Sequence, residues 1–183
     1  MVGEKMIAFD ESVHVIGLRN AAFFASQLFL ESFAADFPIP REQCGLPIPT
    51  PPEAWRQYVA FYKWSDTTFE PVGFCNWIRY GDVYLEGGMC VRRNFYRRLP
   101  KEQWDACKAR GGIAQIITQT AERELDDCFA WFGYCGDKKS YAVHARVGYQ
   151  STDRPYLIVK WFHEPDAQLK RELIDRTAAI GPF

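Results

Sequence analysis

The 183-residue sequence has no long uninterrupted apolar segment and little excess of charge of either sign. No stretch approaches the roughly 20 apolar residues that a membrane-spanning helix needs, and Met1–Asp10 mixes charged with apolar residues. The net charge of −1 gives the whole molecule no field that would gather nucleic acid or an anionic membrane. We therefore expect a cytoplasmic protein that binds neither membrane nor nucleic acid.

The cysteines lack the spacing of a metal site or a redox motif. No two of them form a Cys-x-x-Cys pair, and none has a histidine at ligand spacing. Because free cysteine packs as a small hydrophobe, most are predicted to be reduced core residues, with a cysteine nucleophile as the alternative. No metal site is predicted. The six are Cys44, Cys75, Cys90, Cys107, Cys128 and Cys135.

The composition that is present is typical of one folded domain. Hydrophobic residues make up 48% and charged residues 25% of the chain, and the length suffices to bury a core without disulfides or metal. We predict a single domain over residues 1–183. Prolines dominate a connector at 38–52, where they exclude a helix or a central strand. This connector is either a surface link or a lid over a site.

Three strand-like runs lie close together in the middle of the chain: Trp55–Trp64, Val72–Tyr80 and Val83–Arg92. A parallel pair would need a crossover of a dozen or more residues, so the short links between these runs predict an antiparallel meander.

The rest of the sequence predicts helices both before and after this meander along the chain. Met6–Leu18 suggests an extended segment, and Arg19–Phe37 a helix ending at Pro38, with Phe23, Leu30, Phe33 and Phe37 on one face. After the meander the expected order is helix, helix, strand, helix, strand, helix. The segments are Leu99–Arg110, Ile113–Leu125, Cys128–Cys135, Lys138–Val147, Tyr156–Phe162 and Asp166–Ala178. The fold class is therefore α/β (α+β mixed), with a central, mixed, mostly antiparallel sheet flanked by helices.

Segment 110–114 (Arg-Gly-Gly-Ile-Ala) lies at the expected start of a helix. Free backbone amides and the positive end of the helix dipole bind phosphate there when small residues let it approach. The segment resembles the pyrophosphate loop of the GNAT acetyltransferase superfamily, with Gly112 and Ala114 at its last two small-residue positions. Ala109 stands where that loop has Arg or Gln, so a neighbouring basic residue would supply the charge. A plain hinge between two helices is the alternative.

Two further features carry the resemblance. Residues 137–149 are similar to the family's Asn-x-x-Ala helix and its closing Gly-Phe pair, with Asp137 in place of Asn and Tyr149 in place of Phe; an ordinary helix C-cap is the alternative. Gly87-Gly88 interrupts a strand, as a bulge or a ligand contact does. In the family, a bulge here splays two strands around the pantetheine arm of coenzyme A. The alternative is a glycine pair packed beneath an aromatic side chain.

The resemblance runs from about Trp55 to Phe162 and implies a GNAT-like acyl-CoA-dependent N-acyltransferase, with acetyl-CoA or another acyl-CoA as co-substrate and a small-molecule or peptide amine as acceptor. A homodimer is left open. A helical insertion near 93–110 departs from the family pattern. The cofactor-binding residues implied are Cys90, Val91, Arg92, Arg110, Gly111, Gly112, Ile113, Ala114 and Asp137.

Three side chains are the catalytic candidates that the resemblance implies. Glu86, just before the glycine pair, is placed to act as general base. His144, four residues before Gly148, stands where many family members carry a tyrosine acid, and histidine can donate a proton near neutral pH. Tyr141, one helical turn earlier, is the alternative donor. The competing interpretations are an edge glutamate and a histidine packed against the sheet.

Two other functions remain open at this stage. The chain is alternatively a non-catalytic, acyl-CoA-binding GNAT-like protein, or an α/β interaction domain without a cofactor. The acceptor is not identified, because the segment Arg19–Pro52 that would select it lies outside the matching region.

Overall fold

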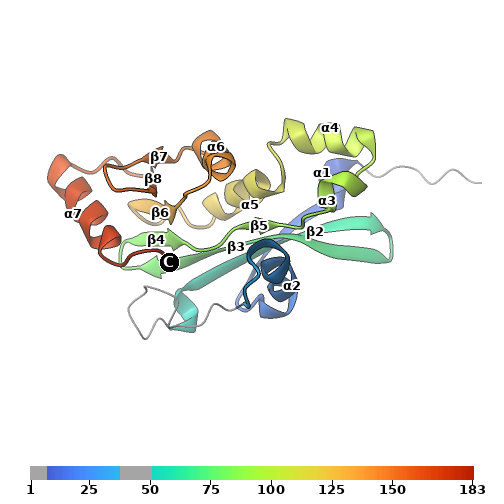
Figure 1. Ribbon diagram of the computed structural model, residues 1–183, viewed down its shortest axis with the longest axis horizontal. Helices are drawn as coiled ribbons and strands as arrows, with labels where there is room; N and C mark the ends of the chain where they lie inside the picture. The colour runs from blue at the N-terminus through green and yellow to red at the C-terminus, as the bar shows by residue number, and fades with distance from the viewer. Residues whose placement is uncertain (1–7, 38–50) are drawn as a thin grey trace, which may run out of the picture.

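The computed structural model describes residues 8–37 and 51–183. These residues form one eight-stranded sheet with helices on both faces (Figure 1). The proline-rich connector predicted at 38–52, apart from its last two residues, and Cys44 lie outside the described residues. No described helix is both long and apolar enough to cross a membrane.

The sheet has the strand order β1-β2-β3-β4-β6-β8-β7, with β5 beside β3. Neighbouring strands are antiparallel except for β4 and β6, which are parallel. The predicted mixed, mostly antiparallel sheet is therefore confirmed. The strands are β1 (Val13–Leu18), β2 (Trp55–Ser65), β3 (Thr68–Tyr80), β4 (Val83–Glu86), β5 (Cys90–Val91), β6 (Ala130–Tyr134), β7 (Gln150–Ser151) and β8 (Leu157–Trp161).

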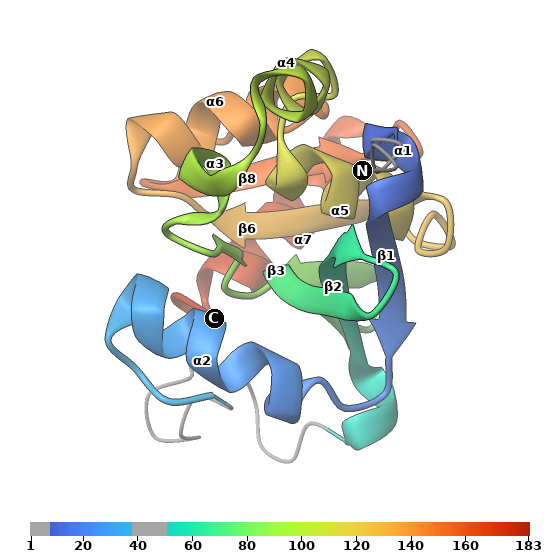
Figure 2. The ribbon, with the colours of Figure 1, turned by 90° about the vertical axis from the view of Figure 1, so that its right-hand side faces the viewer.

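Helices cover the sheet from both sides, with α5 and α6 on one side and α2 on the other (Figures 1 and 2). A 3-10 turn, η2 (Pro52–Ala54), leads into β2. The helices are α1 (Phe9–Ser12), α2 (Ala22–Phe33), α3 (Phe95–Arg98), α4 (Lys101–Ala109), α5 (Ile113–Glu122), α6 (Lys138–Arg146) and α7 (Ala167–Ala178).

Alternation along the strands divides the core into two layers. On one face Leu85 and Phe132 pack with Leu173 of α7. On the other face Trp131 belongs to the cluster that includes Ile117 of α5. Successive side chains of a strand point to opposite faces, so β4 and β6 each contribute to both layers.

Two expectations for the N-terminal part were wrong. Phe9–Ser12 is helical, and the chain becomes extended only at Val13; α1 carries two acidic residues in its first turn, where the helix dipole favours them. Of the apolar stripe predicted from spacing, Phe23, Leu30 and Phe33 are exposed, with Phe23 87% exposed, whereas Phe37 lies beyond the end of α2 and is buried. The buried face is made by Ala25, Leu28 and Phe29 instead. With aromatic residues all round this helix, spacing did not identify the side facing the sheet.

Candidate functional site

The strand predicted at Val83–Arg92 is interrupted after Glu86. Between the pairs Trp77↔Glu86 and Phe74↔Cys90, two residues of β3 lie opposite three residues of the other strand, which defines a β-bulge at 87–89. A Cβ atom on Gly87 would lie 2.6 Å from Asn76, and one on Gly88 2.7 Å from the Phe29 ring. Glycine is therefore required by close approach, and Gly88 does pack beneath an aromatic ring.

This bulge lies where β4 and β6 separate. The two strands pair from Val83↔Ala130 to Glu86↔Gly133. Beyond that point β4 leads into β5, which pairs with β3, whereas β6 continues beside β8. The sheet thus splits immediately after Glu86.

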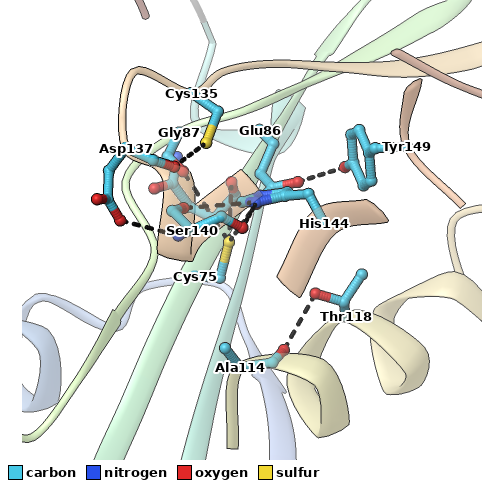
Figure 3. Close-up of polar contacts among 11 residues, drawn as sticks. Cys75, Glu86, Gly87, Ala114, Thr118, Cys135, Asp137, Ser140, His144 and Tyr149 are labelled. Atoms are coloured by element: carbon cyan, nitrogen blue, oxygen red, sulfur yellow. Dashed lines mark hydrogen bonds and ion pairs between the residues drawn. The ribbon is translucent and has the colours of Figure 1, made fainter. Parts of the chain in front are cut away.

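Glu86 lies at the split with its side chain only 3% exposed. Its Oε1 atom is 2.9 Å from His144 Nε2, and its Oε2 atom accepts a hydrogen bond from the Tyr149 hydroxyl (Figure 3). The Cys75 thiol lies 3.8 Å from Oε1. A buried carboxylate is costly unless it is paired and hydrogen-bonded, and these contacts supply both conditions.

Both ring nitrogens of His144 face acceptors. Nδ1 lies 2.8 Å from the carbonyl oxygen of Ser140, and Nε2 faces the Glu86 carboxylate. Burial alone would lower the pKa of His144, but the negative charge and hydrogen bond of Glu86 outweigh it and raise the pKa to about 9. We therefore expect His144 to be an imidazolium ion at neutral pH, which would place both of its ring protons in these hydrogen bonds.

The start of α5 has the features of an anion site. It also has a contact with the Tyr96 hydroxyl that the sequence did not reveal. Gly112 has φ 91° and ψ 170°, a conformation that is almost exclusive to glycine. The Ile113 amide donates to the Tyr96 hydroxyl at 3.2 Å, and the first intrahelical bond starts at Ile116. The amides of Ala114 and of the next residue are therefore the helix-start donors that remain for an anion.

Several predicted cofactor residues are engaged elsewhere. Arg92 pairs with Glu70 at 3.0 Å, and Arg110 pairs with Asp10 of α1. Asp137 caps α6 by accepting the Ser140 amide at 2.8 Å. In β5, Cys90 is buried in the core beneath α2, and burial raises its pKa to about 12. Val91 pairs with β3. Both arginine side chains are thus held in ion pairs with carboxylates.

The Tyr141 side chain contacts β7. Its hydroxyl accepts a hydrogen bond from Ser151 of β7 at 3.1 Å. Together with Cys135 and Tyr156 it lines a cavity of about 400 Å³ beside the β7–β8 hairpin. Of the three catalytic candidates, the structure brings together Glu86 and His144.

Two tyrosines were not among the predicted site residues: Tyr149 contacts Glu86, and Tyr96 contacts the start of α5. Tyr149 stands where the resembling family has phenylalanine. The hydroxyl that it adds could have indicated a polar contact at this position. Tyr96 gave no such signal, because its hydroxyl reaches α5 only through the arrangement of α3 and α4.

Comparisons with known proteins place the fold. No family model matches the sequence, and no curated protein matches it either. The structure resembles the ribosomal-protein-S18-alanine N-acetyltransferase of Escherichia coli (TM-score 0.55, 9% identity, 85% of this chain and 97% of the other). It also resembles the PaiA N-acetyltransferase of Thermoplasma acidophilum, solved in complex with coenzyme A (0.51, 10%, 82% and 99%).

A proposed acetyltransferase from Pyrococcus horikoshii is a third structural neighbour (TM-score 0.51, 16% identity, 83% of this chain). This chain spans 47% of the length of that protein. At these identities the likeness is one of fold. The GNAT acetyltransferase fold predicted from the sequence is therefore confirmed.

Proposed function

We propose that this protein is an acyl-CoA-dependent N-acyltransferase, with acetyl as the expected acyl group. The observation that carries the proposal is the split of β4 from β6 at the bulge, with the buried Glu86–His144 pair beside it. The fold supports it, because the neighbours are N-acetyltransferases and one of them was solved with coenzyme A.

The residues present fit an acyl-CoA molecule at two places. Along the split, the bulge at 87–89 interrupts the strand pairing, and an extended ligand is proposed to lie beside its backbone groups. At the start of α5, the helix dipole and the amide of Ala114 favour a diphosphate. The insertion at 93–110 supplies Tyr96 to the same helix start.

In the proposed reaction an amine nitrogen bonds to the thioester carbonyl carbon, the carbon–sulfur bond breaks, and the thiolate leaves. The amine's proton passes to the Glu86 carboxylate, directly or through water. In the described arrangement both His144 protons are held by Ser140 and Glu86, so its expected role as acid to the thiolate would require one bond to break. We propose instead that His144 stabilises the charge on Glu86.

The acceptor proposed is a small-molecule or peptide amine. A non-catalytic acyl-CoA-binding protein is the second candidate, and the burial of the Glu86 side chain favours it. Cofactor binding is common to both candidates, whereas turnover belongs to the first alone.

Titration calorimetry and thermal melting with acetyl-CoA test the proposal. A ligand at one hundred times its dissociation constant should stabilise the fold by about 2.7 kcal/mol. Ala114→Glu places a negative charge at the start of α5, where it favours the helix but repels a diphosphate, so binding should fall while stability is kept. Ala167→Glu, at the start of α7, is the matched control and should bind as the parent does.

Each outcome has a defined meaning. If the parent does not bind acetyl-CoA at millimolar concentration, both candidate functions are removed. If Ala114→Glu binds normally, the diphosphate lies elsewhere. Binding without thiol release across a panel of small amines and amino-terminal peptides would favour the non-catalytic candidate.

A further inference from the structure

Tyr149 holds the oxygen of Glu86 that His144 does not touch. Gly148, with φ 98°, ends α6 and turns the chain so that the buried Tyr149 ring packs edge-on against the His144 ring, with 5.1 Å between centroids. The Tyr149 hydroxyl donates to Glu86 Oε2. A phenylalanine would fill the same space, so the hydroxyl is the part of this side chain that packing does not require.

Among residues 8–37 and 51–183, the surroundings of the pair supply no other strong donor to the carboxylate. His144 is faced by Glu86 from β4, by the carbonyl of Ser140 from its own helix, and by Cys135 after β6. Glu86 is also faced by the Cys75 thiol of β3, whose pKa burial raises well above its usual range. That thiol therefore stays neutral and is a weak donor. Tyr149 and His144 are the two donors that hold the carboxylate.

A Glu–His pair can carry its one proton in two ways. Either the carboxylate is ionised and the imidazole is positive, or both groups are neutral, and the total charge is the same. A hydrogen bond donated to the carboxylate favours its ionised form. Burial disfavours separated charge, so a hydrogen bond donated from outside the pair shifts the balance toward the ionised form.

We propose that Tyr149 is a positioning residue that keeps Glu86 ionised and His144 positively charged. This inference rests on the proposed function for its purpose, because an ionised Glu86 can accept the amine's proton whereas a protonated one cannot. The chemical step itself is unchanged. The Tyr149 hydroxyl determines whether the pair is in its ionised or its neutral form before the substrate binds.

The test is Tyr149→Phe in the full chain, with nitrogen-15 NMR of the histidine rings at pH 7. In the parent, both His144 nitrogens should be protonated; in the variant, a neutral imidazole should appear as the proton moves to Glu86. His144→Phe identifies the signal, and the exposed His14 and His163 serve as internal references.

Tyr58→Phe is the matched control. Tyr58 is a buried tyrosine whose hydroxyl donates to the carboxylate of Glu124 at 2.7 Å, away from the pair. This variant should leave the His144 spectrum unchanged.

A neutral His144 in the parent at pH 7 would overturn the proposal without any variant. An unchanged His144 spectrum in Tyr149→Phe would overturn it too, as would an equal change in Tyr58→Phe. Because the spectra need no substrate, they decide the role of Tyr149 even if no amine is ever acylated, which would count against the proposed function alone.

Discussion

The two faces of β4 and β6 differ sharply, although they belong to the same strands. Toward α7, Leu85 and Phe132 lie in a wholly apolar cluster. Toward α6, the next residue of β4 is Glu86, buried with His144 and Tyr149. Burying such groups rarely stabilises a protein more than well-packed apolar residues would. The apolar face therefore accounts for stability, and the polar face is the part that chemistry would require.

The largest effect on the polar face should come from Glu86→Gln. The amide cannot accept a proton, so transfer should slow by about 10²–10⁴-fold while acetyl-CoA affinity is kept. Thiol-release kinetics and calorimetry measure the two quantities. Glu124→Gln makes the same change beside Tyr58 and should keep the parental rate. A parental rate for Glu86→Gln at every pH would place the base elsewhere.

On the apolar face, Leu85→Ala should lower the free energy of unfolding by about 2–5 kcal/mol, because it leaves a cavity in a close-packed cluster. Urea denaturation measures this change. The variant should keep the parental His144 spectrum, since Leu85 points away from the pair. A loss below about 1 kcal/mol would mean that this face does not carry the stability assigned to it.

The His144 ion pair should make stability depend on pH. The folded-state pKa of about 9 lies above the usual value of 6.5, so the stabilisation is complete below pH 6.5 and is lost as pH rises toward 9. The difference should be on the order of 2–3 kcal/mol. Urea midpoints at pH 6 and pH 9 test it, with His144→Phe as the variant that lacks this dependence. If the urea midpoint changed with pH equally in the parent and in His144→Phe, the raised pKa would not belong to His144.

The smallest effect is expected at the start of α5. Tyr96→Phe removes the hydroxyl that caps the Ile113 amide, so the free energy of unfolding should fall by about 1 kcal/mol. Acetyl-CoA affinity should not decrease, because the freed amide can donate to a phosphate oxygen. A clear loss of affinity would show instead that the hydroxyl itself contacts the ligand.

The sequence by itself determined most of the elements. Alternating and continuous apolar runs identified the meander and the later strands, because their periodicity follows directly from which faces are buried. The glycine pair at 87–88 marked the bulge. The same signals failed in α2, where apolar residues surround the helix and only contact with the sheet selects the buried side.

Tertiary structure alone decided how the site is assembled. Glu86 and His144 are 58 residues apart, and Arg110 is 100 residues from the Asp10 that neutralises it. Residue type suggested that Glu86, His144 and Arg110 are functional. It did not indicate which side chains contact one another in the folded chain. Pairing depends on the parallel register of β4 with β6 and on α6 folding back over them, and those non-local contacts form only when the whole sheet closes.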